Sequence, residues 1–290
     1  MVQLVEPEVH LIAETGVVRE GLQRLLQSVG APDWETDAQS EAEELMEVAG
    51  RLCYRSFAPG LNPNVTRVRE GNNTYLGNIL NQKHGSVLEH GSVTFAFLGV
   101  SRVFTHELVR HRVGTAYSQE SLRFVRLDAL VAYYPEVGFG EANMRALWDA
   151  LPEPKPHSAR ERWAMERAAL LRCIFKKQFE IAEGTQQAIS DILMLDRVDG
   201  SFSVKKKITS AMRRLAPDGL GTAIITTANH RTLRDVIEKR TSRHAEEEIR
   251  KVYAEVFGQL HERFPAVYSD VAAITEVDGI NEIVFKNQRV

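Results

Sequence analysis

The chain has 290 residues, of which 43% are hydrophobic and 26% are charged, values that are ordinary for a soluble globular protein. Its formal net charge of −3 argues against a broad face that coats nucleic acid, so any basic site must be local. Two cysteines, Cys53 and Cys173, are too few for a disulfide framework or a four-thiolate metal site. Because no basic segment precedes a long apolar run, we expect a soluble, cytoplasmic protein that binds neither membrane nor nucleic acid polymer.

Apolar periodicity predicts a mixed α+β chain, and no linker or change in composition divides it into domains. In chain order we expect a strand at 9–17, a helix at 34–55, a loop at 56–73 leading into a helix that ends near Lys83, a strand at 91–99 and a helix from Ser101 to about Arg112. An ordered loop is expected at 113–121. Prolines at 152, 154 and 156 interrupt residues 135–158, which we expect to form a surface insertion. Helices should follow at 159–195, 203–215, 232–240 and 245–264, and periodicity leaves 221–229 open between a strand and a buried helix turn.

A basic cluster, Arg110-His111-Arg112, lies at the end of the helix expected after Ser101. Three such side chains repel one another unless an anion with several oxygens bridges them, and phosphate or pyrophosphate fits that need. A solvated helix terminus, where cations meet the helix dipole, is the alternative. The segment that follows completes the sequence RHRVGTAYSQESLR and adds an aromatic ring, hydroxyls, an amide and another guanidinium, which favours a site for a phosphorylated nucleotide.

Four motifs in this order resemble the flavin-dependent thymidylate synthase (ThyX) family, and the resemblance extends from about Gly50 to Phe264. They are GRLCYRSF at 50–57, HGSVLEH at 84–90, the RHR triplet followed by a Ser and an Arg, and NHRTLRDVIEKRTSRHAEEEI at 229–249. The family fold implies one catalytic domain with a twisted, antiparallel-containing sheet and flanking long helices. It also implies a homotetramer whose FAD sites are shared between subunits.

The family's chemistry implies methylation of uridylate at C5, with methylenetetrahydrofolate as carbon donor and reduced FAD as hydride donor. NADPH would reduce the flavin. No protein thiolate is needed, so polarisation of the base must make C5 nucleophilic.

The resemblance implies which residues contact each ligand. Those facing FAD are Cys53, Ser86, Arg110, His111, Arg112, Gln119, Asn229, His230, Arg231, Asp235 and His244. Those contacting the nucleotide are Glu107, Arg110, Gln119, Glu120, Ser121, Leu122, Arg123, Arg213 and Arg240. For Cys53, a purely structural thiol remains the alternative.

Two residues are candidates for catalysis by the same resemblance. Arg240 would place a guanidinium beside the uracil and stabilise the negative charge that develops as C5 attacks. His84 would assist methylene transfer or folate binding. Each has a structural alternative, because Arg240 ends a helix and His84 could cap one. No metal is expected, since no HExxH motif occurs and His106 and His111 point to different helix faces.

The spacing after the triplet departs from the family pattern. Residues 113–120 place eight residues between RHR and Ser121, where the family has seven. One extra residue can shift a loop by up to about 3.5 Å, which is enough room for a ribose hydroxyl. This suggests a UMP/dUMP methylase of the kind found in polyoxin-type antibiotic pathways, whereas an outward bulge would leave a strict dUMP enzyme. A flavin reductase or oxidase without methyl transfer and a nucleotide- or RNA-binding module are the remaining alternatives.

Overall fold

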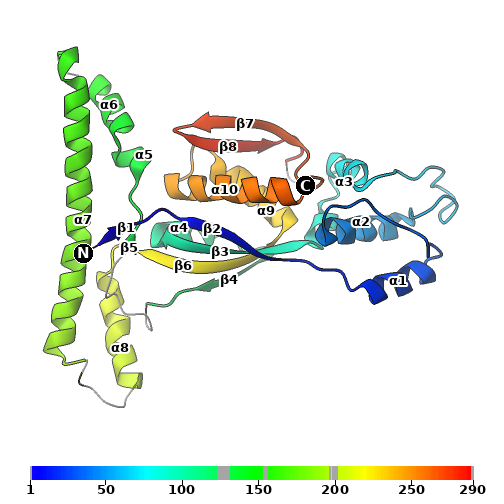
Figure 1. Cartoon of the computed structure of the whole chain (residues 1–290), viewed down its shortest axis with the longest axis horizontal. Helices are drawn as coiled ribbons and strands as arrows, with labels where there is room; N and C mark the ends of the chain where they lie inside the picture. The colour runs from blue at the N-terminus through cyan, green and yellow to red at the C-terminus, as the bar shows by residue number, and fades with distance from the viewer. Residues whose placement is uncertain (1, 123–130, 153–155, 196, 198–201, 289–290) are drawn as a thin grey trace. The chain divides into compact units, whose positions relative to one another are not determined.

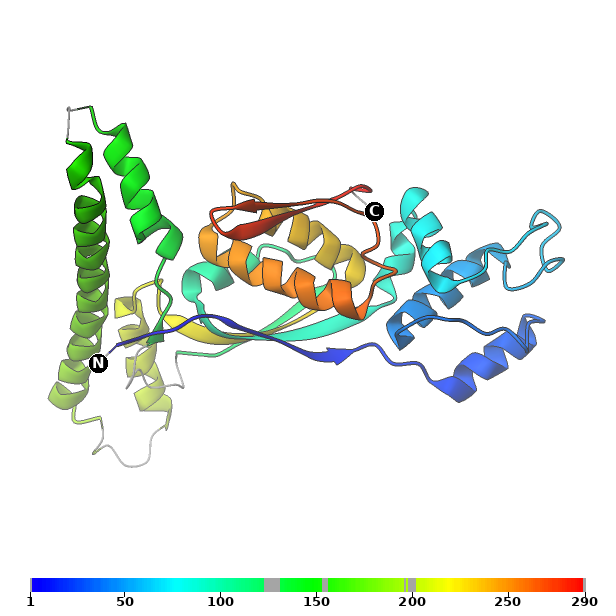
Figure 2. The same cartoon turned by 45° about the horizontal axis from the view of Figure 1, so that its top comes forward.

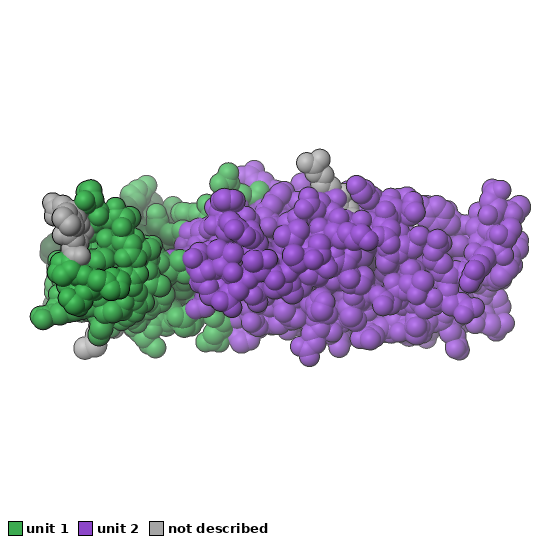
Figure 3. Space-filling view, turned by 90° about the horizontal axis from the view of Figure 1, so that it is seen from above, with its two compact units in different colours: residues 1–8, 97–110, 118–224 green, residues 9–96, 111–117, 225–290 purple. Residues whose placement is uncertain are grey.

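The computed structural model describes residues 2–122, 131–152, 156–195, 197 and 202–288. The chain forms two compact units (Figure 3). Unit 1 comprises residues 1–8, 97–110 and 118–224, and unit 2 comprises residues 9–96, 111–117 and 225–290. Because each unit draws on three separate stretches of chain, neither is a continuous segment, and the single catalytic domain stays a prediction.

The main sheet contains four strands in the order β2-β3-β6-β4 (Figure 1). β3 alternates buried Val93, Phe95 and Phe97 with more exposed neighbours, as the sequence pattern predicts. The strands are β1 (Gln3–Leu4), β2 (Glu8–Glu14), β3 (Ser92–Ser101), β4 (Thr115–Gln119), β5 (Val131–Ala132), β6 (Gly221–Asn229), β7 (Val271–Val277) and β8 (Ile280–Phe285). β1 pairs with β5 in parallel, and β7 pairs with β8 in antiparallel fashion.

Two strands differ from what the sequence pattern suggests. The stretch 221–229, which periodicity leaves open, forms β6, with Ile224 and Ala228 buried on one side. The expectation of a loop without regular structure at 113–121 is wrong, because residues 115–119 form β4 at the edge of the sheet. Its alternating half-buried and exposed residues are mostly polar, so an apolar pattern could not reveal it.

The helices largely follow the predicted order. They are α1 (Arg19–Ser28), α2 (Glu41–Tyr54), α3 (Asn72–Asn81), α4 (Arg102–Leu108), α5 (Glu136–Phe139), α6 (Glu141–Ala150), α7 (Arg160–Ile192), α8 (Phe202–Met212), α9 (His230–Thr241) and α10 (Glu247–Arg263), with short 3-10 turns η1 (Gly85–Glu89), η2 (His157–Ala159) and η3 (Arg213–Leu215). The cap predicted at Ser101 is confirmed, since its hydroxyl accepts the Phe104 amide at 3.1 Å.

In unit 1, α7 is the longest helix and α6 lies beside it (Figure 2). Trp148 of α6 and Trp163 of α7 meet with ring centroids 5.3 Å apart. The prediction that residues 135–158 do not form one continuous helix is confirmed, because α5 and α6 are separated at Gly140. Whether this stretch is an insertion stays a prediction.

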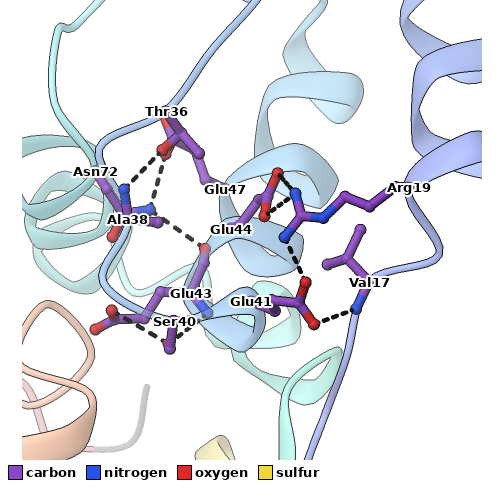
Figure 4. Close-up of polar contacts among 10 residues, drawn as sticks. All are labelled: Val17, Arg19, Thr36, Ala38, Ser40, Glu41, Glu43, Glu44, Glu47 and Asn72. Atoms are coloured by element: carbon purple, nitrogen blue, oxygen red, sulfur yellow. Dashed lines mark hydrogen bonds and ion pairs between the residues drawn. The ribbon is translucent and has the colours of Figure 1, made fainter.

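In unit 2, α2 begins at Glu41, later than expected, because the Ser40 hydroxyl accepts the Glu43 amide at 3.2 Å. Its outer face pairs Glu41 and Glu44 with Arg19, whereas Glu47 turns inward and accepts hydrogen bonds from side chains on other segments (Figure 4). This helix therefore has an acidic side that pairs with Arg19 and two almost fully buried acidic residues, Glu43 and Glu47.

The C-terminal part of unit 2 fixes the position of α9. α9 and α10 pack together, and β8 contacts both. The β7–β8 hairpin turns at Asp278 and Gly279, both with positive φ, the geometry that an Asp-Gly pair favours. This hairpin was not predicted from the sequence.

Candidate active site

In unit 2, the structure joins the middle of the RHR triplet to the predicted catalytic arginine. The Nε–H of Arg240, near the end of α9, donates to Nε2 of His111 at 2.7 Å. Since a guanidinium only donates, this His111 nitrogen must carry a lone pair, and the imidazole is then neutral with its proton on Nδ1. His111 thus orients Arg240 without adding a negative charge.

The backbone of His111 is fixed by the strand that follows it. The hydroxyls of Thr115 and Tyr117 both donate to the His111 carbonyl oxygen, the first at 2.6 Å. Burial raises the pKa of Tyr117, whereas the nearby Arg240 charge partly opposes that rise. β4 therefore holds the triplet through two neutral hydroxyl donors, which is the structural role of a segment expected to be an irregular loop.

The start of α9 carries two predicted flavin contacts. The side-chain oxygen of Asn229 caps the helix by accepting the Thr232 backbone amide at 2.9 Å. The backbone amide of Asn229 donates to the Gly114 carbonyl. Arg231 forms an ion pair with Glu89 at 2.5 Å, with both side chains nearly half exposed. Gly114 has φ +69°, and a Cβ there would lie 2.4 Å from the Asn229 amide nitrogen. Only glycine suits this approach.

His230 requires a correction. Its side chain is fully buried, packed edge-on to Phe264, and its Nδ1 lies 3.1 Å from the Tyr268 hydroxyl. Burial lowers the pKa of His230 to about 3. A ring in this position is not available to a cofactor, so His230 is a core residue and not a flavin contact.

The other predicted flavin residues of unit 2 lie at the surface. Asp235 is exposed and pairs with Lys239 one helical turn later at 2.7 Å, and His244 is exposed beyond the end of α9. Ser86 is exposed in η1, and Cys53 is an exposed free thiol in α2. Arg112 is exposed and forms no hydrogen bond or ion pair within the described part of the chain.

Unit 1 carries most of the predicted nucleotide residues. Arg110, with 72% of its side chain exposed, lies 4.0 Å from Glu107 one turn earlier on α4. The Gln119 side-chain amide donates to the Thr105 hydroxyl at 3.1 Å. The Glu120 backbone amide donates to the Ala223 carbonyl at 2.9 Å, which continues the pairing beyond β4.

Three further nucleotide candidates have different environments. Leu122 is partly buried and packs against a core cluster that includes Phe179 and Leu220, and its predicted substrate contact stays a prediction. Arg213 is exposed at the start of η3, and Ser121 is half-buried. Arg123 lies outside the described residues.

His84, the second catalytic candidate, lies at a cavity of about 410 Å³ in unit 2. Its Nδ1 lies 2.7 Å from the Tyr54 hydroxyl, and the two rings stack with centroids 5.8 Å apart. As an alternative, His84 was expected to cap the preceding helix; at the end of α3 its backbone amide donates to the Ile79 carbonyl at 3.1 Å, while its side chain contacts Tyr54. The sequence analysis missed three other lining residues, Tyr54, Arg67 and Arg69. The sequence signal for these arginines was the alternation Arg67-Val68-Arg69 within a polar stretch.

Neither a metal cluster nor a membrane-crossing helix is found where the structure can be described. No group of three or more His, Cys, Asp or Glu side chains among the described residues could hold a metal ion. Over the same residues, no helix is long and apolar enough to cross a bilayer.

Comparison with known proteins identifies the class that this fold and site define. The profile of the Thy1 family, described as thymidylate synthase complementing protein, matches residues 36–266. The flavin-dependent thymidylate synthase of Mycobacteroides abscessus is 32% identical over 282 residues, covering 96% of this chain and 95% of the relative. That of Mycobacterium tuberculosis is 33% identical over 273 residues, covering 92% and 95%. The chain belongs to this family.

A solved structure confirms the fold. The UMP/dUMP methylase PolB from Streptomyces cacaoi, bound with 5-Br UMP, superposes with a TM-score of 0.57 at 16% identity, covering 92% of this chain and 95% of PolB. A second PolB structure, with 5-Br dUMP, gives the same TM-score. The family and the α+β fold predicted from sequence are both confirmed.

Proposed function

We propose that this chain methylates C5 of a uridine monophosphate, with methylenetetrahydrofolate as carbon donor, FAD as flavin and NADPH as reductant. One observation carries the proposal beyond family membership: the hydrogen bond between Arg240 and His111 joins the predicted catalytic residue to the RHR triplet. These residues are 129 positions apart in the sequence. A purely solvated basic terminus would not need this contact.

The donor set of the triplet fits a flavin dinucleotide. Arg110 and Arg112 are both exposed; Arg110 has a single carboxylate neighbour, Glu107 at 4.0 Å, and Arg112 has no hydrogen-bond or ion-pair partner among the described residues. Two guanidiniums on either side of a neutral imidazole can therefore donate to a pyrophosphate. Exposed Ser86, Arg231 and Asp235 add hydroxyl, guanidinium and carboxylate groups. When bound, reduced FAD supplies the hydride that completes the methyl group.

The chain's own contribution to the reaction is electrostatic. Arg240 is held at Nε by His111, so its guanidinium keeps a fixed direction while its charge is not cancelled by that partner. A fixed cation at the uracil edge stabilises the negative charge that develops on the base as C5 attacks. In unit 1, Glu107, Gln119, Glu120, Ser121 and Arg213 are the remaining candidates for holding the nucleotide.

We assign both dUMP and UMP as substrates. The eight-residue spacer from 113 to 120 is accommodated by a tight turn at Gly114 before β4 begins at Thr115, where family members have one residue fewer. PolB, which shares the fold, was solved with analogues of both nucleotides. The two observations support a pocket that accepts a ribose 2′-hydroxyl.

One set of assays tests these assignments. The purified protein should be yellow with a flavin spectrum, and it should form 5-methylated product from each nucleotide in the presence of methylenetetrahydrofolate and NADPH. Product from dUMP alone would identify a strict thymidylate synthase. Oxidation of NADPH that needs neither folate nor pyrimidine, without methylated product, would identify a flavin reductase or oxidase instead.

We propose that helix α7 forms a subunit contact in the homotetramer that the family resemblance implies. Leu170, Ile174 and Ile181 share one side of this helix and are 51%, 56% and 53% exposed. Apolar side chains at this spacing form a seam that packs against another helix. Replacing Ile174 and Ile181 with Glu should reduce the mass measured by light scattering, whereas Lys176→Glu on the same helix should not. The exposed thiols of Cys53 and Cys173 suit the cytoplasm.

A further inference from the structure

A second cavity adjoins the one at His84 through shared residues. The first, of about 410 Å³, is lined by residues between Arg51 and His84. The second, of about 440 Å³, is lined by Arg67, Val68, Arg69, Glu70 and Thr74. Residues 67–69 line both, and we call them the arginine ridge. Each cavity is within the size range of small-molecule sites.

One arginine that lines the first cavity, Arg51, already has a carboxylate partner. Arg51 is buried, its guanidinium contacts Glu47 at 2.6 Å, and it lies 4.5 Å from the centre of the Tyr75 ring. Glu47 in turn accepts hydrogen bonds from Thr36 at 2.6 Å and Asn72 at 2.8 Å (Figure 4). Arg51 also donates to the backbone carbonyls of residues 56 and 69. Its donors are used inside the fold, so it braces the cavity and does not bind an anion there.

The two arginines of the arginine ridge, unlike Arg51, have no carboxylate partner among the described residues. Arg67 and Arg69 are both exposed, and neither guanidinium has a hydrogen-bond or ion-pair partner in the described part of the chain. The first cavity has no Asp or Glu among its lining residues, and Glu70 is the one acid that lines the second. Two residues of extended chain span about 7 Å, so the pair can meet two anionic groups on one molecule. Unpaired guanidiniums at a cavity mouth favour carboxylates or phosphates.

The lining of the first cavity also includes a flat aromatic surface. The rings of Tyr54 and His84 stack at 22° to each other, and Tyr54 is 42% exposed. Stacked rings of this kind favour a planar heterocycle. Because the same cavity is lined by exposed arginines and by an aromatic pair, it suits a ligand that has a flat ring and an anionic tail.

We propose that the arginine ridge binds the anionic tail of a ring-bearing cosubstrate whose head approaches Tyr54 and His84. This inference rests on the proposed function, which brings two such molecules to the chain. A reduced folate carries glutamyl carboxylates, and NADPH carries phosphates. The shared chemistry is a chain of anions contacting Arg67 and Arg69, which makes these two residues determinants of cosubstrate affinity.

The test compares Arg67→Gln/Arg69→Gln with Arg24→Gln. Arg24 is an exposed arginine of the same unit that lies outside both cavities and has no side-chain partner among described residues. Dissociation constants are measured directly on the flavin-loaded protein by titration with 5-formyltetrahydrofolate in monoglutamyl and triglutamyl forms. NADPH and NADH are compared through the rate of flavin reduction. Because the substituted side chains are exposed, circular dichroism and melting temperature should not change.

Two outcomes support the proposal and identify the tail. If the ridge holds glutamyl carboxylates, the double variant should bind the triglutamate about two- to thirtyfold more weakly, with a smaller loss for the monoglutamate. If it holds the extra phosphate of NADPH, the half-saturating NADPH concentration should rise by a similar factor while that of NADH does not. Either loss should shrink as salt is added.

Equal affinities in the double variant and in Arg24→Gln, for all four probes, would overturn the proposal. The proposed function fails in a different way. A protein that binds these molecules with ridge-dependent affinity but forms no 5-methylated nucleotide would refute the methylation and leave the ridge in place. A protein that methylates uridylate with an unchanged double variant would refute the ridge alone.

Discussion

Arg51 and Arg240 are held in the same way but by opposite kinds of partner. Each donates from Nε at 2.7 Å, Arg51 to the Glu47 carboxylate and Arg240 to the His111 imidazole. The carboxylate cancels the charge of Arg51, which is buried on the floor of a cavity. The neutral imidazole gives Arg240 a direction and adds no negative charge. The two arginines thus show two ways to fix the direction of a guanidinium, one with a charged acceptor and one with a neutral acceptor.

The largest expected effect comes from separating the buried ion pair between Arg51 and Glu47. Glu47→Ala leaves Arg51 buried without its carboxylate, and we expect a loss of about 3–5 kcal/mol in the free energy of unfolding. Urea denaturation measures this loss. Glu41→Ala is the matched control on the same helix, because Glu41 pairs with Arg19 at the surface (Figure 4). Similar losses in both variants would show that Arg51 does not depend on Glu47.

Removing Arg240 tests the other side of the comparison. Arg240→Ala should lower kcat for methylation by about 10²–10³ because a fixed cation is lost from the transition state. Flavin content and melting temperature should change little. Arg240→Lys keeps a positive charge but lacks the planar fork, so it should recover only part of the rate. Full activity in the alanine variant would remove the catalytic assignment.

Substituting His111 tests the orientation of Arg240 separately from the charge of Arg240. His111→Leu removes the acceptor for the Arg240 Nε–H, and we expect kcat/KM for the nucleotide to fall about ten- to hundredfold. His111→Gln places a carbonyl oxygen near the former Nε2 position and should restore most of that loss. If both variants instead lost flavin to the same extent with unchanged turnover per bound flavin, His111 would be a cofactor contact and not a positioning residue.

A further expected effect is a pH dependence of stability from the buried imidazole at the start of α9. The pKa of His230 is about 3 in the folded chain, below its ordinary value of 6.5, so the unfolded chain binds the extra proton between these values. Stability should therefore fall as pH drops from about 6 to 4, by about 1.4 kcal/mol per pH unit from this residue. His230→Phe should make the slope shallower by that amount, whatever its stability at neutral pH. An unchanged slope would contradict the assignment.

The sequence predicted the order of helices well because their signals are local. Ser101 caps α4 as expected, and the periodic stretches become α7, α9 and α10. The short polar strand β4 gave no apolar pattern, since its hydroxyls serve the triplet and not the core. Similarly, the Asp-Gly pair at 278–279 was a readable turn signal, but the hairpin it closes went unpredicted.

The candidate site was predictable in residue type but not in environment. The resemblance to the family implied that Arg240 and His111 serve the same active site, and the structure joins them by a hydrogen bond. His230 is adjacent in sequence to predicted ligand contacts, yet a helix turns neighbouring side chains to different faces, and this one faces the core. Leu122 was assigned to the substrate together with its neighbours, and its partly buried side chain packs against a core cluster, which its sequence position did not indicate. Burial depends on distant segments that no local pattern reveals.

The hydroxyl of Thr241 connects α9 to the C-terminal hairpin. It donates to the Ile237 carbonyl at 2.8 Å and accepts the Ile283 amide at 3.0 Å, and Arg243 pairs with Glu282 beside it. Arg240 immediately precedes Thr241 in the sequence. We therefore expect substitutions in the hairpin at 278–285 to alter turnover through the position of the Arg240 guanidinium.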